Sequence, residues 1–302
     1  MRRLLLKLTL IATPFAVYAL AVVAIDPFDY FRRSAAAERA MKATIAGKLD
    51  PPLWKLIAYS RSPRPHILLG DSRMHSLGEE AIETRIGAPV ANLAFGGGSL
   101  KEAIRTFWIA AGVTELKSVT IGVNLDTYND NNGKDRVGPA ESVMRNPGLY
   151  IFDRLVALGL WLTIRAAVTG DTADIGLPPM THEDFWRYQL EVTATRFYSG
   201  YRDPANYRRQ LAEVAKECAR RHIELRFVIF PEHADLLVLA RRAGLATQRE
   251  RMRDELGTFG TTIDFSGRND WIEDRRSFID PFHPAPTVDS KIIERIWGDR
   301  VN

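Results

Sequence analysis

The sequence contains little from which covalent or metal cross-links can be made. Cys218 is the only cysteine among 302 residues, which excludes an intramolecular disulfide and a cysteine metal cluster. The six histidines are scattered, and no two of them have the His-x-x-x-His spacing of a helical zinc site. We therefore expect neither a metal nor another cofactor.

Several recurrent patterns are also missing. There is no internal repeat, no long low-complexity tract, and no cluster of Lys and Arg interleaved with aromatic residues, so we expect no nucleic-acid partner. The formal net charge is +4, and three of the basic residues precede an apolar amino-terminal segment, which leaves the remainder nearly neutral. With 46% hydrophobic and 26% charged residues, the composition is that of a globular protein. The length fits one α/β domain with appendages.

An uncharged apolar run extends over Leu8–Ile25. As a helix it would be about 27 Å long, which is close to the hydrocarbon thickness of a bilayer, so we expect a transmembrane anchor. Basic residues flank the run on both sides, and Asp26 and Asp29 follow it directly. We place the short tail inside the cell and the rest of the chain outside the cytoplasm, on the periplasmic side.

A cleavable signal peptide is the alternative to an anchor, with Ala19-Leu20-Ala21 as its cleavage site. The apolar run continues beyond that site to Ile25, which favours a retained anchor. Both interpretations export the domain. A buried core helix fits less well, because no polar face interrupts the run.

From residue 63 onward, short apolar runs alternate with helical patterns. Runs rich in Val, Ile and Leu are typical of strands that are buried on both faces. Alternating strands and helices predict an α/β fold with a central parallel sheet. The predicted strands are His66–Leu69, Val90–Ala94, Ser118–Asn124, Ile223–Phe230 and Thr261–Phe265, and the predicted helices are Leu77–Ile86, Leu100–Ala111, Pro204–His222 and Pro286–Trp297.

The pattern divides the chain into an anchor at 1–25, a tether at 26–62 and one domain at 63–302 with an insertion at about 127–200. The tether contains a helical patch at Ala35–Ala46, followed by the break Asp50-Pro51-Pro52. The insertion contains a loop at Asn129–Gly133 and an apolar helix near Tyr150–Val168.

Three chemically distinctive segments follow the first three predicted strands. Ser72 comes after the first strand, Gly96-Gly97-Gly98 after the second, and Asn124 ends the third. In an open parallel sheet, ligands bind beyond the carboxyl ends of the strands. We therefore expect these three segments to converge on one crevice.

Together with the late segment Asp280-Pro281-Phe282-His283, these residues can perform acyl transfer. A serine hydroxyl such as that of Ser72 becomes a nucleophile when an imidazole removes its proton, and a carboxylate such as Asp280 orients that imidazole. The oxyanion needs donors, for which we nominate the Ser72 amide, a glycine amide of the triplet and the Asn124 side chain.

Each of these residues also has a plain structural interpretation. Ser72 can cap a helix, the glycine triplet can form a turn, Asn124 can cap or turn, and His283 can be a loop residue. The triplet has neither the lysine of a P-loop nor the spacing of a dinucleotide fingerprint. Ser72 lacks the Gly-x-Ser-x-Gly context of the α/β-hydrolase nucleophile elbow. Their joint placement at strand ends and in the last loop favours an active site.

The blocks resemble those of the SGNH/GDSL hydrolase superfamily. Gly70-Asp71-Ser72 is similar to the first block, and Asn92–Ser99 to the second. Gly122–Asp126 is similar to the third block, except that Leu125 is inserted before Asp126, and Asp280–His283 matches the fifth.

The resemblance implies a flavodoxin-like three-layer α/β/α fold. It implies the catalytic residues Ser72, His283 and Asp280. It also implies an oxyanion hole formed by Ser72, Gly97 and Asn124.

One amino-terminal span before such a domain resembles the membrane-anchored branch that O-acylates cell-surface polymers, such as the alginate and cellulose O-acetylation proteins and the teichoic-acid D-alanylation protein. This resemblance implies acyl transfer to a cell-surface polysaccharide and a membrane-bound O-acyltransferase as partner. The alternatives are a carbohydrate esterase or lipase-type hydrolase, and a non-catalytic protein that binds a polysaccharide or an acyltransferase.

Overall fold

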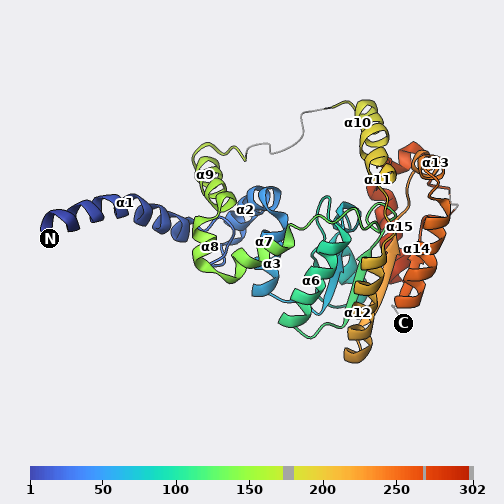
Figure 1. Ribbon diagram of the computed structural model, residues 1–302, viewed down its shortest axis with the longest axis horizontal. Helices are drawn as coiled ribbons and strands as arrows, with labels where there is room; N and C mark the ends of the chain where they lie inside the picture. The colour runs from blue at the N-terminus through green and yellow to red at the C-terminus, as the bar shows by residue number, and fades with distance from the viewer. Residues whose placement is uncertain (173–179, 268–269, 299–302) are drawn as a thin grey trace. The chain divides into compact units, whose positions relative to one another are not determined.

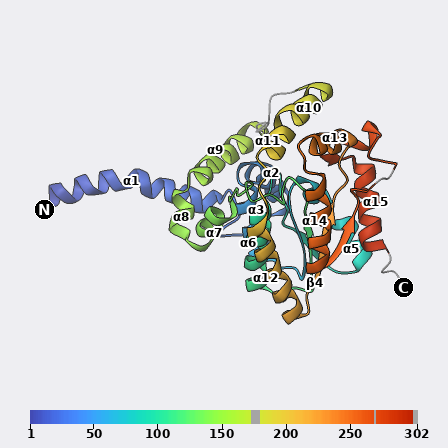
Figure 2. The ribbon, with the colours of Figure 1, turned by 45° about the vertical axis from the view of Figure 1, so that its right-hand side comes forward.

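A computed structural model describes residues 1–172, 180–267 and 270–298 (Figure 1, Figure 2). The chain forms two compact units. The first, which we name the anchor unit, comprises Met1–Ser62 and Arg136–Leu177. The second, the sheet unit, comprises Pro63–Asp135 and Pro178–Asn302.

The sheet unit is built on a five-stranded parallel sheet with the strand order β2-β1-β3-β4-β5. Every residue of the central strand β3 is buried, as expected of a strand that is covered on both faces. The predicted α/β fold with a parallel sheet is confirmed. The strands are β1 (His66–Leu69), β2 (Val90–Asn92), β3 (Ser118–Gly122), β4 (Glu224–Ile229) and β5 (Thr261–Asp264).

Helices pack on both sides of this sheet. α5 (Glu79–Ile86) and α15 (Pro286–Trp297) lie on one side, where Leu68 and Val228 of the strands join their apolar residues in one core cluster. α6 (Leu100–Val113) and α12 (Ala205–Arg221) lie on the other side and contact each other (Figure 2). The remaining described elements of the unit are α4 (Ser72–His75), α10 (His182–Tyr188), a π-helix (Gln189–Ala194), α11 (Thr195–Ser199), α13 (Ala234–Arg242), α14 (Ala246–Phe259), a 3₁₀ turn (Arg275–Ser277) and the hairpin of β6 (Phe278–Asp280) and β7 (His283–Pro284).

The anchor unit is helical in its described part. Its first helix, α1, is long and apolar enough to span a membrane, and a signal sequence passes the same test. The predicted apolar helix at Tyr150–Val168 is two helices, because Asp153 interrupts it and caps the second through the amides of Leu155 and Val156. The helices are α1 (Arg2–Ile25), α2 (Ala36–Leu49), α3 (Pro51–Arg61), α7 (Val137–Arg145), α8 (Pro147–Phe152) and α9 (Arg154–Thr169).

Segments that we predicted to be a tether and an insertion come together in this unit. α2 contacts α9, and α3 contacts α7. Ile45 of α2 packs with Leu162 and Ala166 of α9 in an apolar cluster. Such a pairing joins segments about a hundred residues apart, which the periodicity of either segment does not reveal. Residues 127–135 and 180–200 of the predicted insertion belong to the sheet unit, and 173–179 lie outside the described residues.

Candidate active site

A tight turn places Ser72 at the carboxyl end of β1. Gly70 has a φ of 144°, and a Cβ atom at this position would lie 3.2 Å from the carbonyl oxygen of Gly122. A side chain is therefore disfavoured here by both conformation and space. Asp71 then caps α4 by accepting the Arg73 amide at 3.0 Å. Ser72 follows as the first residue of that helix and lines a pocket.

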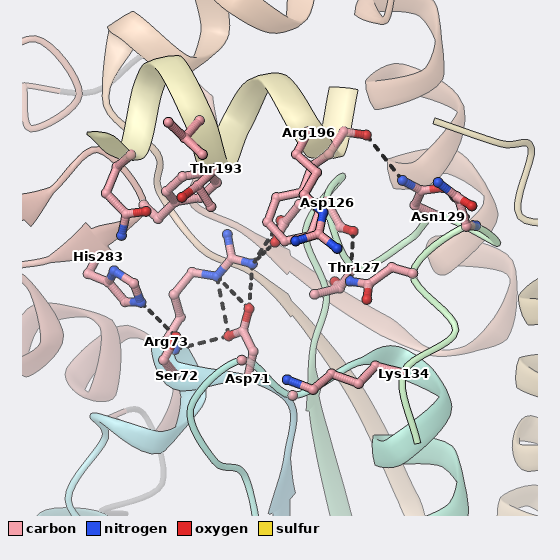
Figure 3. Close-up of a pocket in the computed structure, with 18 of the residues that line it drawn as sticks. Asp71, Ser72, Arg73, Asp126, Thr127, Asn129, Lys134, Thr193, Arg196 and His283 are labelled. Carbon is pink, nitrogen blue, oxygen red and sulfur yellow. Dashed lines mark hydrogen bonds and ion pairs between the residues drawn. The ribbon is translucent and has the colours of Figure 1, made fainter. Parts of the chain in front are cut away.

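The hydroxyl of Ser72 meets an imidazole from the other end of the chain. The distance from Ser72 Oγ to His283 Nε2 is 2.6 Å, and His283 Nδ1 lies 2.7 Å from Asp280 Oδ2 (Figure 3 shows the serine and the histidine). Because an ionised carboxylate only accepts, Nδ1 carries the proton and Nε2 is free to accept the serine proton. This is the arrangement of a nucleophile, a general base and an orienting acid.

The β6–β7 hairpin holds the acid and the base in place. Asp280 ends β6, His283 begins β7, and Asp280 Oδ1 accepts the amides of Phe282 at 2.8 Å and His283 at 3.2 Å. Burial of Asp280 disfavours its charged form, but the hydrogen bonds and charge of the groups around it, His283 above all, outweigh burial and lower its pKa. The carboxylate is therefore ionised and able to fix the imidazole.

Gln189 is a member of this site that the sequence did not reveal. Its Nε2 donates to Asp280 Oδ2 at 3.3 Å, which is the same oxygen that accepts from His283. Gln189 is the first residue of the π-helix, and π-helical turns occur frequently at functional sites. No spacing in the sequence links a glutamine to an aspartate 91 residues later.

Two of the predicted oxyanion donors lie together. Gly97 and Gly98 line the pocket with Ser72. A Cβ atom on Gly98 would lie 2.6 Å from the Gly70 carbonyl oxygen, so only glycine permits the second turn to approach the first this closely. Ser72 and Gly97 thus line one pocket, and their role in the oxyanion hole stays a prediction.

Asn124, the third predicted donor, is not among the residues that line this pocket. Its side-chain amide donates to the Phe230 carbonyl at 3.0 Å, and its oxygen accepts the Phe230 amide at 3.1 Å. The side chain is buried and connects the segments that follow β3 and β4. The Asn124 side chain is therefore bound to the Phe230 backbone and lies outside the pocket lining, and its role in the oxyanion hole stays a prediction.

A buried arginine lies directly behind the nucleophile. The guanidinium of Arg73 contacts Asp71, Asp126 at 2.8 Å and Glu232 at 3.2 Å (Figure 3 shows the first two). Glu232 also pairs with Arg249. Sequence analysis missed this cluster, because its members come from four segments, of which only those containing Asp71 and Asp126 were singled out.

Charge within this cluster is unevenly distributed. Burial disfavours the charged form of Arg73, but Asp126 and Asp71 outweigh burial and raise its pKa. Burial raises the pKa of Asp71, but Arg73 outweighs it and the net shift is downward. Asp126 has a raised pKa, because burial and the neighbouring carboxylates outweigh Arg73. The Arg73 cation next to Ser72 therefore contacts one carboxylate with a lowered pKa, Asp71, and one with a raised pKa, Asp126.

The pocket above these groups has a volume of about 740 Å³, which is in the range of small-molecule sites. One wall is the loop that follows Asp126, and another is the segment Tyr188–Phe197, which includes the π-helix. Lys134 and Arg196 reach toward the Asp71 and Arg73 pair from different sides (Figure 3). The lining also includes Thr127, Asn129, Asn131, Asn132, Gly133, Gln189, Val192, Thr193 and Phe282.

Within the described ranges, no group of three or more His, Cys, Asp or Glu side chains has the geometry to hold a metal ion. The carboxylates of the Arg73 cluster surround the guanidinium instead.

No protein-family model and no curated protein matches the chain. The interpretation of the site therefore depends on its geometry.

Proposed function

We propose that the protein is a serine acyl-transfer enzyme that uses Ser72, His283 and Asp280 to move an acyl group onto a hydroxyl. The observation that carries the proposal is the continuous chain of hydrogen bonds from Ser72 Oγ through His283 to Asp280, which opens on a pocket of about 740 Å³. A buried serine in a cap or a turn needs neither an imidazole base nor a cavity.

The topology supports an SGNH-type assignment for the fold. The strand order 2-1-3-4-5 is the order of flavodoxin-like doubly wound sheets, in which ligands bind beyond the carboxyl ends of the strands. Ser72 and Gly97 follow β1 and β2 at those ends. The position of the site and the layered packing of helices are both those expected of a three-layer α/β/α enzyme.

In the proposed first half-reaction, His283 Nε2 accepts the Ser72 proton as Oγ attacks the carbonyl carbon of an acyl donor. The carbonyl oxygen becomes an oxyanion, which the amides of Ser72 and Gly97 stabilise. Collapse of this intermediate breaks the bond to the leaving group, which takes the proton from His283. Ser72 now carries the acyl group as an ester, and Asp280 has stabilised the transient imidazolium.

In the second half-reaction, His283 removes the proton from an acceptor hydroxyl, which attacks the Ser72 ester. The intermediate collapses, the acyl group leaves with the acceptor, and the proton returns from His283 to Ser72 Oγ. No net proton is released when the acceptor is an alcohol. With water as acceptor, the same steps release a carboxylic acid.

The pocket lining supports a carbohydrate as substrate, and in the proposed transfer a hydroxyl of that carbohydrate is the acceptor. It presents amide and hydroxyl side chains, among them Asn131, Asn132 and Thr193, beside the apolar surfaces of Val192 and Phe282. Such a mixture suits a sugar ring, which offers hydroxyls at its edge and apolar C–H groups on its faces. An esterase acting on an acylated carbohydrate would use the same lining, and it is the second candidate function.

The amino-terminal helix gives the proposed enzyme a location. With α1 retained as an anchor, the sheet unit lies outside the cytoplasm, where it reaches cell-surface polymers. A membrane-bound O-acyltransferase is the proposed partner that supplies the acyl group.

Replacing the nucleophile tests the proposal. The variant Ser72→Ala in the full chain should lose about 10⁴- to 10⁶-fold in acyl transfer, because the residual rate comes from binding and the oxyanion hole alone. Ser290→Ala, which removes a hydroxyl from the exposed face of α15, is the matched control. Release of free acid should be compared with the ester formed on a glycan, because this ratio separates hydrolase from transferase. A folded protein whose Ser72 is never labelled by an organophosphonate would contradict catalysis and favour a binding protein.

A further inference from the structure

Large apolar side chains on α8 and α9 of the anchor unit face outward. Phe152 is 63% exposed, Trp161 is 61% exposed and Val168 is 80% exposed. Contiguous apolar patches on a soluble surface mark interaction sites, whereas isolated exposed residues need no explanation. The exposed set, which we name the outer face, is Leu149, Phe152, Leu158, Trp161, Ile164 and Val168.

The outer face of α9 is a mostly apolar stripe. Leu158, Trp161, Ile164 and Val168 follow one another at intervals of three or four residues, which places them on one side of the helix, and Arg154 and Arg165 share that side. The remaining side is also apolar and is already buried, since Leu162 and Ala166 pack against α2. Apart from its two arginines, the exposed side is thus largely apolar like the buried side, and a helix that is apolar on both sides is normally enclosed.

α8 connects the outer face to the membrane-spanning candidate α1. The amino-acid contacts are specific: the hydroxyl of Tyr18, on α1, donates to the Ile151 carbonyl at 2.7 Å, and the Tyr18 and Phe152 rings lie 6.2 Å apart. α8 lies beside the end of α1 in both ribbon views (Figure 1, Figure 2). Exposed apolar residues of α1 extend along the helix as far as Leu20 and Val23. The surface that α1 offers to lipid therefore continues onto α8.

The junction after α1 is rigid. Asp26 has a left-handed conformation with a φ of 51°, and its carboxylate accepts the amides of Tyr30 and Phe31 at 2.7 Å. The same carboxylate accepts the Tyr150 hydroxyl at 2.8 Å. Burial and Asp26 raise the pKa of Tyr150, so its hydroxyl keeps the proton that it donates. α8 is thus held to the end of α1 by side chains as well as by the chain.

We propose that α8 and α9 lie in the outer interface of the bilayer that α1 crosses, with the outer face at the boundary between head groups and acyl chains. Amphipathic helices bury their apolar side about 5–10 Å into this boundary. Trp161, Tyr18 and Phe152 are ring-bearing residues at this boundary, and Trp and Tyr are enriched at membrane interfaces. The proposal depends on a retained α1 but not on the proposed catalytic activity.

The large side chains of the stripe favour lipid, rather than a transmembrane helix of another protein, as the group that covers it. Helix–helix contacts within membranes use small residues that let two backbones approach closely. The stripe instead presents Leu158, Trp161 and Ile164, which are large. Acyl chains adapt to such an irregular surface.

The test measures the depth of a spin label on the full-length protein in nanodiscs of phosphatidylethanolamine and phosphatidylglycerol. One label is attached at Trp161→Cys. The matched control is Trp108→Cys, at a tryptophan of α6 in the sheet unit that is 43% exposed. Burial raises the pKa of the native Cys218 thiol to about 12, which keeps it unreactive toward the label.

At position 161 we expect collisions with oxygen, which dissolves in lipid, to exceed those with a water-soluble nickel chelate. At position 108 we expect the reverse. Leu158→Cys, one turn earlier on the same stripe, gives a second reading that does not depend on replacing the tryptophan. Nickel collisions at both 158 and 161 as frequent as those at 108 would overturn the proposal. The proposal would also be overturned if the label at 158 or 161 became shielded from the nickel chelate only after a membrane protein was added. That result would favour a protein partner.

Discussion

The sheet unit and the anchor unit each bury a charged cluster, and the two clusters are balanced differently. In the sheet unit, Arg73 faces Asp71, Asp126 and Glu232, so carboxylates outnumber the central cation and two of them line the pocket. In the anchor unit, Lys42 donates to the Ile25 carbonyl, the Ser34 hydroxyl and Asp29, and also pairs with Glu38.

The two clusters differ in their surroundings: the Arg73 cluster borders a cavity, whereas the Lys42 cluster joins the end of α1 to α2. Buried charges are tolerated when they are paired and hydrogen-bonded, which Lys42 achieves with neighbouring backbone and side-chain groups. The Arg73 cluster instead keeps Asp126 with a raised pKa at the edge of a ligand-sized space. Perturbed carboxylates in a cleft are a property of functional sites. Substitutions in the two clusters and in the proposed triad beside the Arg73 cluster test this difference.

The largest expected effect is that of Asp280→Asn. The amide keeps the shape of the carboxylate but no longer holds His283 in the tautomer that accepts the Ser72 proton, so kcat should fall by about 10⁴-fold. Pre-steady-state measurement of acyl-enzyme formation with a chromogenic ester checks this, with thermal unfolding to show that the fold is retained. A loss of less than tenfold would remove Asp280 from the triad.

Arg73→Met should come next. It leaves the buried carboxylates without their cation, and removal of one partner of a buried ion pair costs about 3–5 kcal/mol. Urea denaturation followed by tryptophan fluorescence measures the loss. The free-energy difference between the variant and the native protein should also become smaller as the pH falls, because protonation removes the charge of the unpaired carboxylates. Equal destabilisation at pH 5 and pH 8 would contradict this electrostatic explanation.

Lys42→Met should cost less than Arg73→Met, about 1–3 kcal/mol, the penalty of leaving buried acceptors unsatisfied. Asp29 keeps its ion pair with Arg39 at 3.0 Å and its hydrogen bond from Ser34 at 2.7 Å. Hydrogen exchange in detergent-solubilised full-length protein should show faster exchange in α2 and unchanged exchange in β1 and β3. A cost greater than that of Arg73→Met would reverse the comparison between the clusters.

Gln189→Leu should have the smallest effect, a loss of about tenfold in kcat/KM, since it removes one hydrogen bond to a charged group. Gln189 is among the groups that lower the pKa of Asp280, so without it this pKa should rise. The carboxylate of the native protein stays ionised until the pH falls below its usual value near 4. The pH at which Asp280 becomes protonated should therefore be higher in the variant, which NMR titration of the labelled aspartate carboxyl measures. Gln189→Asn, which shortens the side chain but keeps the amide, is the matched control for packing.

The strands could be predicted because local apolar runs determine them. β1 matches its predicted bounds, and β2 to β5 were predicted one or two residues too long. The rule that ligands bind at the carboxyl ends of parallel strands was enough to bring Ser72 and the glycine turn together. His283 followed from chemistry, because a serine nucleophile requires a base.

Side-chain direction could not be predicted. Asn124 sits where a strand ends, as the rule requires, but its amide is used by the backbone of Phe230, 106 residues later. Arg73 and Gln189 were missed for the same reason, since their partners come from distant segments. The division of α8 from α9 at Asp153 is a local cap that an apolar helical pattern conceals.

The separation of Ser72 and His283 by 211 residues has a consequence for the synthesis and folding of the protein. During synthesis, the serine emerges early and the β6–β7 hairpin emerges late. Until that hairpin docks, the proposed nucleophile has no base and its hydroxyl is chemically inert. If Ser72 is the nucleophile that we propose, its reactivity therefore begins only when the chain is complete and folded.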